Sequence, residues 1–143
     1  LVDETERELA IWCLDFLAHI RAQKEITTTS TATHKEIALT LKAGKNGTYG
    51  TADLVELYSD DTAILMDWKT GYLGVEDAET NIQVQTYTYG VLEKFENIKQ
   101  VDSYLVLPRR QEITHAVYTR DDMGRIKLRA STIIARAKEL GGV

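Results

Sequence analysis

The sequence predicts a single α/β domain over residues 1–143, built as a central mixed β-sheet flanked by helices. Helical periodicity opens and closes the chain, strand-like segments separated by turn residues lie between them, and one more helical segment interrupts the strands. A chain of 143 residues with 43% hydrophobic and 27% charged residues is large enough for one core and has the composition of a globular domain. The expected order of elements is α-β-β-β-α-β-(β)-α.

The first helix is expected from residue 3 to about residue 23. Its apolar residues recur at the spacing of one face of an amphipathic helix. They are Leu9, Trp12, Cys13, Phe16, Leu17 and Ile20. Residues 27–33 read TTTSTAT and lack apolar alternation, so we expect a loop or a frayed strand between this helix and the sheet.

Three strands are expected next, over residues 36–42, 50–58 and 62–69. The clusters Lys-Asn-Gly at residues 45–47 and Ser-Asp-Asp at residues 59–61 suit tight connections between antiparallel strands. The three strands should therefore form an antiparallel meander.

A helix is expected after the meander. Residues 78–96 lack strand alternation and should form this helix, with Asp77 or Thr80 as its cap. Residues 103–107 form a further apolar strand, which Pro108 ends because proline cannot donate to the sheet.

The chain should finish with a short strand and a long helix. Residues 115–119 are a weaker strand candidate, and residues 121–140 carry helical apolar spacing up to the Gly141-Gly142 stop signal. The apolar positions of this last helix are Ile126, Ala130, Ile133, Ala137 and Leu140.

Composition excludes several classes of protein. The longest apolar run, residues 63–66, is far shorter than the roughly 20 residues of a transmembrane helix, and no signal-peptide pattern is visible, so no membrane partner is expected. Cys13 is the only cysteine. It excludes an internal disulfide and a four-cysteine zinc or iron–sulfur site held by this chain alone, and it fits a reducing cytoplasm.

The formal charge of −5 argues against a uniformly basic coat for nucleic acid, but the charge is unevenly distributed. Residues 1–96 carry 17 acidic and 8 basic residues, net −9, whereas residues 97–143 carry 5 and 9, net +4. The basic residues of the last helix suit a solvated face and a track for phosphates equally well. They are Arg125, Lys127, Arg129, Arg136 and Lys138.

Asp53, Asp67 and Lys69 are the residues most informative about chemistry. Side chains alternate between the two faces of a strand, so Asp67 and Lys69 point to one side and Trp68 to the other. If a turn at residues 60–61 joins the two strands, Asp53 and Asp67 are each about seven residues from it and lie side by side.

Two adjacent carboxylates need a compensating cation, and their hard oxygen atoms suit Mg²⁺ or Mn²⁺. A neighbouring lysine can hold a phosphate oxygen or orient a water molecule whose pKa the metal lowers. This group of residues therefore indicates hydrolysis of phosphodiester bonds. The alternative for Asp67 and Lys69 is a simple ion pair at the end of a surface strand.

Three motifs together resemble the PD-(D/E)XK nucleases, specifically their RecB-like exonuclease branch from phages and prophages. They are GTADLV at residues 50–55, DWKTG at residues 67–71, and Gln83 followed by Tyr87 on a helix. The resemblance spans roughly residues 36–110 and implies the α-β-β-β-α-β core of the restriction-endonuclease-like fold. Ala52 stands where the proline that names the family is found.

The resemblance implies a role for each matching residue. Asp53 and Asp67 would bind the metal, together with the Trp68 carbonyl and Glu36, and Lys69 would be the catalytic lysine. The upstream helix that carries a metal-binding histidine in many relatives is not evident, and His19, His34 and His115 are not assigned to the site. Gln83 and Tyr87 would orient the active site or contact DNA. The expected DNA-binding residues are Gln83, Tyr87, Lys94, Arg109 and Arg110.

Gln83 and Tyr87 have competing interpretations. Thr80 and Gln83 have the spacing of a capping box, in which the glutamine bonds back to the helix start. Gln85 and Tyr89 repeat the spacing of Gln83 and Tyr87 two residues later, which leaves the register of the motif open.

The expected function is a Mg²⁺- or Mn²⁺-dependent deoxyribonuclease, an exonuclease acting on linear DNA in recombination, repair or phage DNA processing. A structure-specific endonuclease of the junction-resolvase kind and a non-catalytic DNA-binding module are the alternatives. DNA is the expected partner, with a helicase, a recombination protein or a second copy of the chain as a further one. The expected compartment is the cytoplasm of a bacterium or of a phage-infected host cell.

Overall fold

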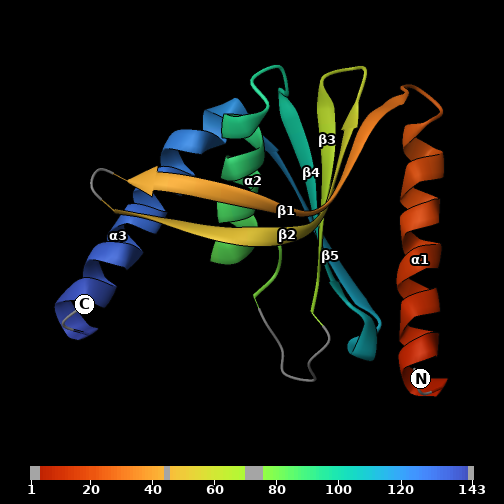
Figure 1. Cartoon of the computed structure of the whole chain (residues 1–143), viewed down its shortest axis with the longest axis horizontal. Coiled ribbons are helices and arrows are strands. Elements are labelled where there is room, and N and C mark those ends of the chain that lie inside the picture. Colours follow the sequence, from red (N-terminus) through yellow and green to blue (C-terminus); the bar gives the residue numbers. More distant parts are fainter. Residues whose placement is uncertain (1–3, 44–45, 70–75, 142–143) are drawn as a thin grey trace.

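Five strands form one mixed sheet in the order β1-β2-β3-β4-β5 in a computed structural model, which describes residues 4–43, 46–69 and 76–141 (Figure 1). The helices are α1 (Glu4–Lys24), α2 (Ile82–Lys94) and α3 (Met123–Gly141). The strands are β1 (Ser30–Ala43), β2 (Asn46–Tyr58), β3 (Thr62–Trp68), β4 (Gln100–Leu107) and β5 (Glu112–Thr119). Two short 3₁₀ turns, η1 (Pro108–Arg110) and η2 (Arg120–Asp122), flank β5. The predicted α/β class is confirmed.

Pairing between the strands follows the predicted meander. β1, β2 and β3 pair antiparallel in sequence order, whereas β4 lies parallel to β3 and α2 makes the crossover between them. Two parallel strands must be joined by a long connection, and here that connection contains α2. The connection leaves from the end of β3 and places α2 against the sheet.

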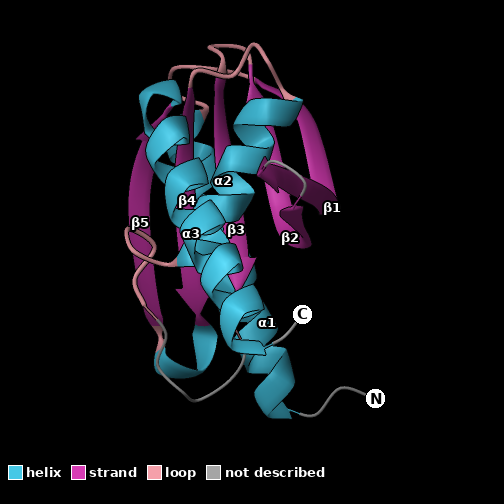
Figure 2. Cartoon of the chain, turned by 90° about the vertical axis from the view of Figure 1, so that its left-hand side faces the viewer, coloured by secondary structure: helices cyan, strands magenta, loops and turns pink. Residues whose placement is uncertain are grey.

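Helices cover both faces of the sheet. α1 packs on one face, where Leu17 and Ile20 meet Leu54, Ile64 and Met66. The opposite face is covered by α2, with α3 lying against α2 (Figure 2). Within the described residues, no helix combines the length and the apolar character that a membrane crossing requires.

The boundaries of several elements differ from the predicted ones by a few residues. β1 already begins at Ser30, inside the stretch expected as a loop or frayed strand, because Ser30 pairs with Tyr58 and the Thr31 hydroxyl donates to the Leu57 carbonyl. Gly47, expected in a turn, pairs with Lys42, and residues 44–45 lie outside the described part of the chain.

The start of α2 corrects the prediction of its cap. Neither Asp77 nor Thr80 caps the helix: Asn81 does, and its side-chain oxygen accepts hydrogen bonds from the backbone N–H groups of Gln83 and Val84. Asparagine is among the best N-cap residues, and the turn before it is closed by the Asp77 carbonyl. Helix α2 therefore begins at residue 82 rather than 78.

Arginines from the C-terminal third hold α2 at both ends. Arg120 donates to the last carbonyls of the helix region, those of Leu92, Phe95 and Glu96, at 2.7–3.0 Å. Arg129 donates to the Thr80 carbonyl at 2.7 Å, just before the helix begins. Helix ends leave backbone groups without partners, so these contacts satisfy them and fix the position of α2 along its own axis.

Candidate functional site

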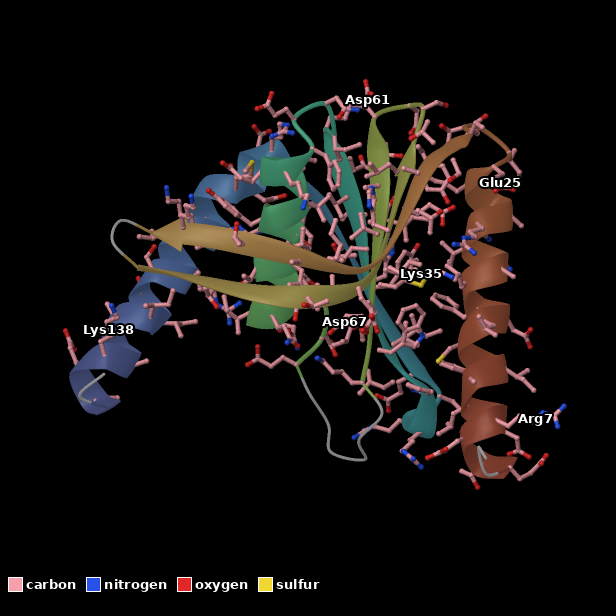
Figure 3. The ribbon with its side chains drawn as sticks, viewed as in Figure 1. Arg7, Glu25, Lys35, Asp61, Asp67 and Lys138 are labelled. Atoms are coloured by element: carbon pink, nitrogen blue, oxygen red, sulfur yellow. The ribbon has the colours of Figure 1, made fainter. Side chains whose placement is uncertain are left out.

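Asp53 and Asp67 lie side by side on the neighbouring strands β2 and β3. β2 pairs with β3 up to Leu54 and Met66, and one step further in the same register Asp53 faces Asp67. The structure therefore brings these two residues together, as the alternation of strand side chains predicted. Figure 3 shows Asp67 near the centre of the molecule, towards the end of β3.

Asp67 is a buried carboxylate that pairs with Lys69. It is only 3% exposed, and its Oδ2 atom lies 2.9 Å from Lys69 Nζ. The geometry of this contact is that of an ion pair, and Oδ2 receives no well-directed hydrogen bond from a described residue. Burial raises the pKa of Asp67 to about 6, an effect that Lys69 opposes and Asp53 reinforces.

Asp53 is held by the backbone of the neighbouring strand. Its Oδ2 atom accepts a 2.7 Å hydrogen bond from the Trp68 N–H. The Trp68 peptide group therefore lies beside the two carboxylates, while its indole packs on the other face of the sheet with the residues that contact α1. The Trp68 carbonyl is one of the predicted metal ligands, and this backbone position is compatible with that role.

Gln83 and Tyr87 reach the same place from α2. Gln83 Nε2 donates to the Tyr87 hydroxyl at 3.1 Å. Burial raises the pKa of Tyr87, and the charge of Asp67 raises it further, so this phenol lies close to the carboxylates. The capping-box interpretation of Gln83 is wrong, because Asn81 is the cap and the Gln83 side chain is directed to Tyr87.

Gln85 and Tyr89 face away from this group. Gln85 Nε2 donates to the Glu79 carbonyl and its oxygen accepts from Arg129, while Tyr89 packs in the cluster that includes residues of α3. The register in which Gln83 and Tyr87 face the carboxylates is therefore the one that the structure adopts.

Gly50 makes room for Tyr87. A Cβ atom on Gly50 would lie 2.7 Å from Tyr87 Cε1 and 2.8 Å from its hydroxyl oxygen. Any larger residue would push the ring away from β2, so this glycine brings the phenol close to the strand that carries Asp53. The motif at residues 50–55 includes Gly50, but its contact with Tyr87 depends on the packing of α2 on β2 and could not be predicted from the sequence.

Glu36 lies opposite Asp53 in the pairing of β1 with β2. Its neighbours Lys35 and Ile37 pair with the residues on either side of Asp53, and its own side chain is exposed. Its φ of 51° is in the left-handed region that non-glycine residues rarely adopt. No group of three or more His, Cys, Asp or Glu side chains among the described residues is arranged to hold a metal ion.

A groove of about 610 Å³ runs between α1 and the strands and reaches Asp53. Glu36, Asp53 and Trp68 line it together with the cationic side chains of Arg21 and Lys35. The groove therefore connects the position of Glu36 with the edge of the carboxylate pair.

The predicted DNA-binding cations are dispersed. Lys94 is exposed at the far end of α2, about two turns from Tyr87. Arg109 and Arg110 follow β4 at the end of the sheet where Lys69 N–H donates to the Val106 carbonyl, so they lie at the same sheet end as Lys69. Arg110 is paired with Glu112 at 3.2 Å. Residues 70–71, the last two of the DWKTG motif, lie outside the described residues.

Asp67 should make stability depend on pH. The pKa of Asp67 is raised from 3.8 to about 6 in the folded state. Its contribution to the free energy of unfolding is therefore fully present below pH 4 and is lost as the pH rises through about 6. In metal-free buffer at pH 8, Asp67→Asn should therefore increase the free energy of unfolding by roughly 1–3 kcal/mol. Urea denaturation at pH 4 and pH 8 checks this, and equal destabilisation of Asp67→Asn at both values would contradict it.

Fold and site together define an α/β protein whose mixed sheet presents two carboxylates and a lysine to one covering helix. The chain belongs to the DUF2800 family, described as proteins of unknown function, whose family model matches residues 3–139. No curated protein matches the sequence significantly. The solved structure of SSO0001 is similar over 90% of this chain, with 13% identity and a TM-score of 0.40, and the chain spans 58% of its length.

Proposed function

We propose that the protein is a metal-dependent DNA nuclease of the PD-(D/E)XK type, with a restriction-endonuclease-like core, that hydrolyses phosphodiester bonds from the ends of linear DNA. The observation that carries this proposal is the buried Asp67, which lies beside Asp53 and 2.9 Å from Lys69 on neighbouring strands. The protein would be more stable with an apolar or neutral side chain at this position than with a carboxylate. The presence of Asp67 therefore favours a function that needs negative charge there.

The donor set fits a hard divalent cation, Mg²⁺ or Mn²⁺. Asp67 Oδ2 is buried and receives no well-directed hydrogen bond from a described group, so it retains a lone pair for a cation. Asp53 and the Trp68 carbonyl would be its other protein ligands, with Glu36 on β1, opposite Asp53, as a further candidate. When bound, such an ion lowers the pKa of a coordinated water molecule and offsets phosphate charge.

Lys69 and Tyr87 supply hydrogen-bond donors to the phosphate. The Lys69 side chain is 32% exposed, so its ammonium can contact a ligand while it remains paired with Asp67. Burial and the charge of Asp67 raise the pKa of Tyr87, so the phenol keeps its proton at neutral pH. The Tyr87 oxygen accepts from Gln83, and its own proton remains available for a phosphate oxygen.

A cleavage assay on linear and closed circular DNA tests the proposal. With Mn²⁺ we expect progressive loss of end-labelled linear DNA, no cleavage of covalently closed circles, and no cleavage in EDTA. Nicking of circles at the rate seen for linear DNA would instead favour a structure-specific endonuclease. Absence of cleavage of any DNA with Mg²⁺ or Mn²⁺ would overturn the proposal.

A non-catalytic DNA-binding module is the second candidate, and the exposure of the Glu36 side chain opposite Asp53 favours it. Calorimetric titration with Mn²⁺ distinguishes the two functions. The nuclease should bind Mn²⁺ and lose that binding in Asp67→Ala, while Asp121→Ala, which changes an exposed carboxylate outside the site, should bind like the wild type. No binding to the wild type would favour the module.

A further inference from the structure

A pocket of about 270 Å³ begins where the candidate site ends, between α2, α3 and the start of β2. It is called the α2–α3 pocket below. Its lining residues are Thr48, Ile82, Gln83, Thr86, Tyr87, Ala130, Ile133 and Ile134. Gln83 and Tyr87 belong both to this pocket and to the group around Asp67, so a ligand that fills the pocket lies directly beside the carboxylates.

The walls of the α2–α3 pocket combine apolar and hydrogen-bonding groups. Ile82 from α2 and Ala130, Ile133 and Ile134 from α3 form its apolar part. Ile133 is 42% exposed although it lies on the apolar face of α3. Thr86 is 8% exposed and lines the pocket, so its side chain brings a hydroxyl group there. Such a hydroxyl can either donate to a ligand or accept from one.

We propose that the α2–α3 pocket holds one unpaired nucleobase of the strand whose phosphate lies at Asp53, Asp67 and Lys69. This inference rests on the proposed nuclease function. A nucleobase has two apolar faces and a hydrogen-bonding edge, which match the isoleucine walls and the Thr48, Gln83 and Thr86 side chains. Because each hydroxyl serves donors and acceptors alike, any base can occupy the pocket.

The size of the pocket restricts its occupant. At about 270 Å³ it lies just below the range of about 300–1,000 Å³ typical of small-molecule sites, so it suits a single base rather than a base pair. A base can enter only after it leaves the stack of a duplex. The substrate class is therefore single-stranded DNA or a frayed duplex end.

Equilibrium binding of single-stranded oligonucleotides tests the inference without relying on turnover. Using the Lys69→Met protein with Mn²⁺, fluorescence anisotropy is measured with one abasic site moved along the strand. An abasic site at one position should raise Kd roughly tenfold, the effect of losing one stacked base. Equal Kd values at every abasic position would overturn the inference.

Paired substitutions on α3 locate the effect in the pocket. Ile133→Glu and Leu128→Glu each add one negative charge at an exposed position of the same helix, but only Ile133 lines the pocket. We expect Ile133→Glu to raise Kd for the intact strand roughly tenfold. The same variant should not change Kd for the strand whose abasic site weakens binding to the Lys69→Met protein. Leu128→Glu should leave both Kd values within about twofold of those of the Lys69→Met protein. Equal effects of the two variants would contradict the inference. Thermal unfolding checks that both variants are folded.

The outcomes for the pocket and for the nuclease function are separable. If the wild type cleaves DNA but degrades blunt duplex as fast as single strands and tolerates every abasic site, the pocket does not hold a base while the nuclease function stands. If the wild type neither cleaves nor binds any DNA, both fail together.

Discussion

Lys69→Met is expected to lower the rate of metal-dependent DNA cleavage by roughly 10²- to 10³-fold, the usual cost of removing one preorganised donor from a site of charge development. The Lys69 ammonium is 2.9 Å from Asp67 Oδ2. Methionine has a similar length and no charge, so the change isolates the ammonium group.

The fold should survive this substitution because Asp67 can take up a proton. Its pKa is already raised to about 6 by burial, and loss of the opposing lysine raises it further. Lys99→Met, at an exposed lysine before β4, is the matched control and should cleave at the wild-type rate. Rates of Lys69→Met within twofold of the wild type would remove Lys69 from the catalytic machinery.

Arg21→Ala is expected to reduce the free energy of unfolding by about 3 kcal/mol, which is a large part of the roughly 5–15 kcal/mol typical of a domain. Arg21 Nε and Nη2 lie 2.7 and 2.6 Å from Glu56 Oε2, and the Tyr58 hydroxyl donates to Oε1 at 3.1 Å. Glu56 is only 2% exposed, so removing Arg21 leaves a buried carboxylate without its cation.

Urea denaturation at pH 7 measures this effect. Arg7→Ala on the same helix is the control, since Arg7 is exposed and labelled in Figure 3 at the outer side of α1. The double variant Arg21→Met and Glu56→Leu should recover most of the lost stability, because an apolar pair needs no desolvation of charge. A loss for Arg21→Ala no larger than that for Arg7→Ala would contradict the prediction.

The carboxylate pair could be predicted from sequence because it depends only on local rules. A turn at residues 59–61 fixes the register of β2 against β3, and the alternation of side chains then brings Asp53 opposite Asp67. No long-range contact had to be known. The same argument could not reach Glu36, whose left-handed backbone at φ 51° is not encoded by residue type.

Helix α3 shows that apolar periodicity alone does not predict which residues are buried. The apolar spacing of α3 continues to Leu140, yet only Ile126 and Ala130 are buried, and Leu140 is 89% exposed. In Figure 1 the C-terminal end of the helix extends beyond the sheet. Periodicity shows which face of a helix is apolar, but the length of the surface that it packs against is a tertiary property.

The cap of α2 shows a similar limit at the scale of single residues. Asp77, Thr80 and Asn81 all belong to the types that favour an N-cap, and the sequence pattern alone does not choose among them. The choice of Asn81 leaves the side chain of Gln83 free to bond Tyr87. The position of the N-cap therefore decides whether the Gln83 side chain bonds to the start of the helix or to Tyr87.

The arginines that hold α2 have a consequence for ionic strength. Arg120 and Arg129 donate to backbone carbonyls, and Arg125 pairs with Asp122, so these cations are engaged within the protein. Each phosphate that a protein neutralises adds to the salt dependence of DNA binding. The net charge of +4 in residues 97–143 therefore overstates the charge available to a polyanion, and DNA affinity should fall only gradually with added salt.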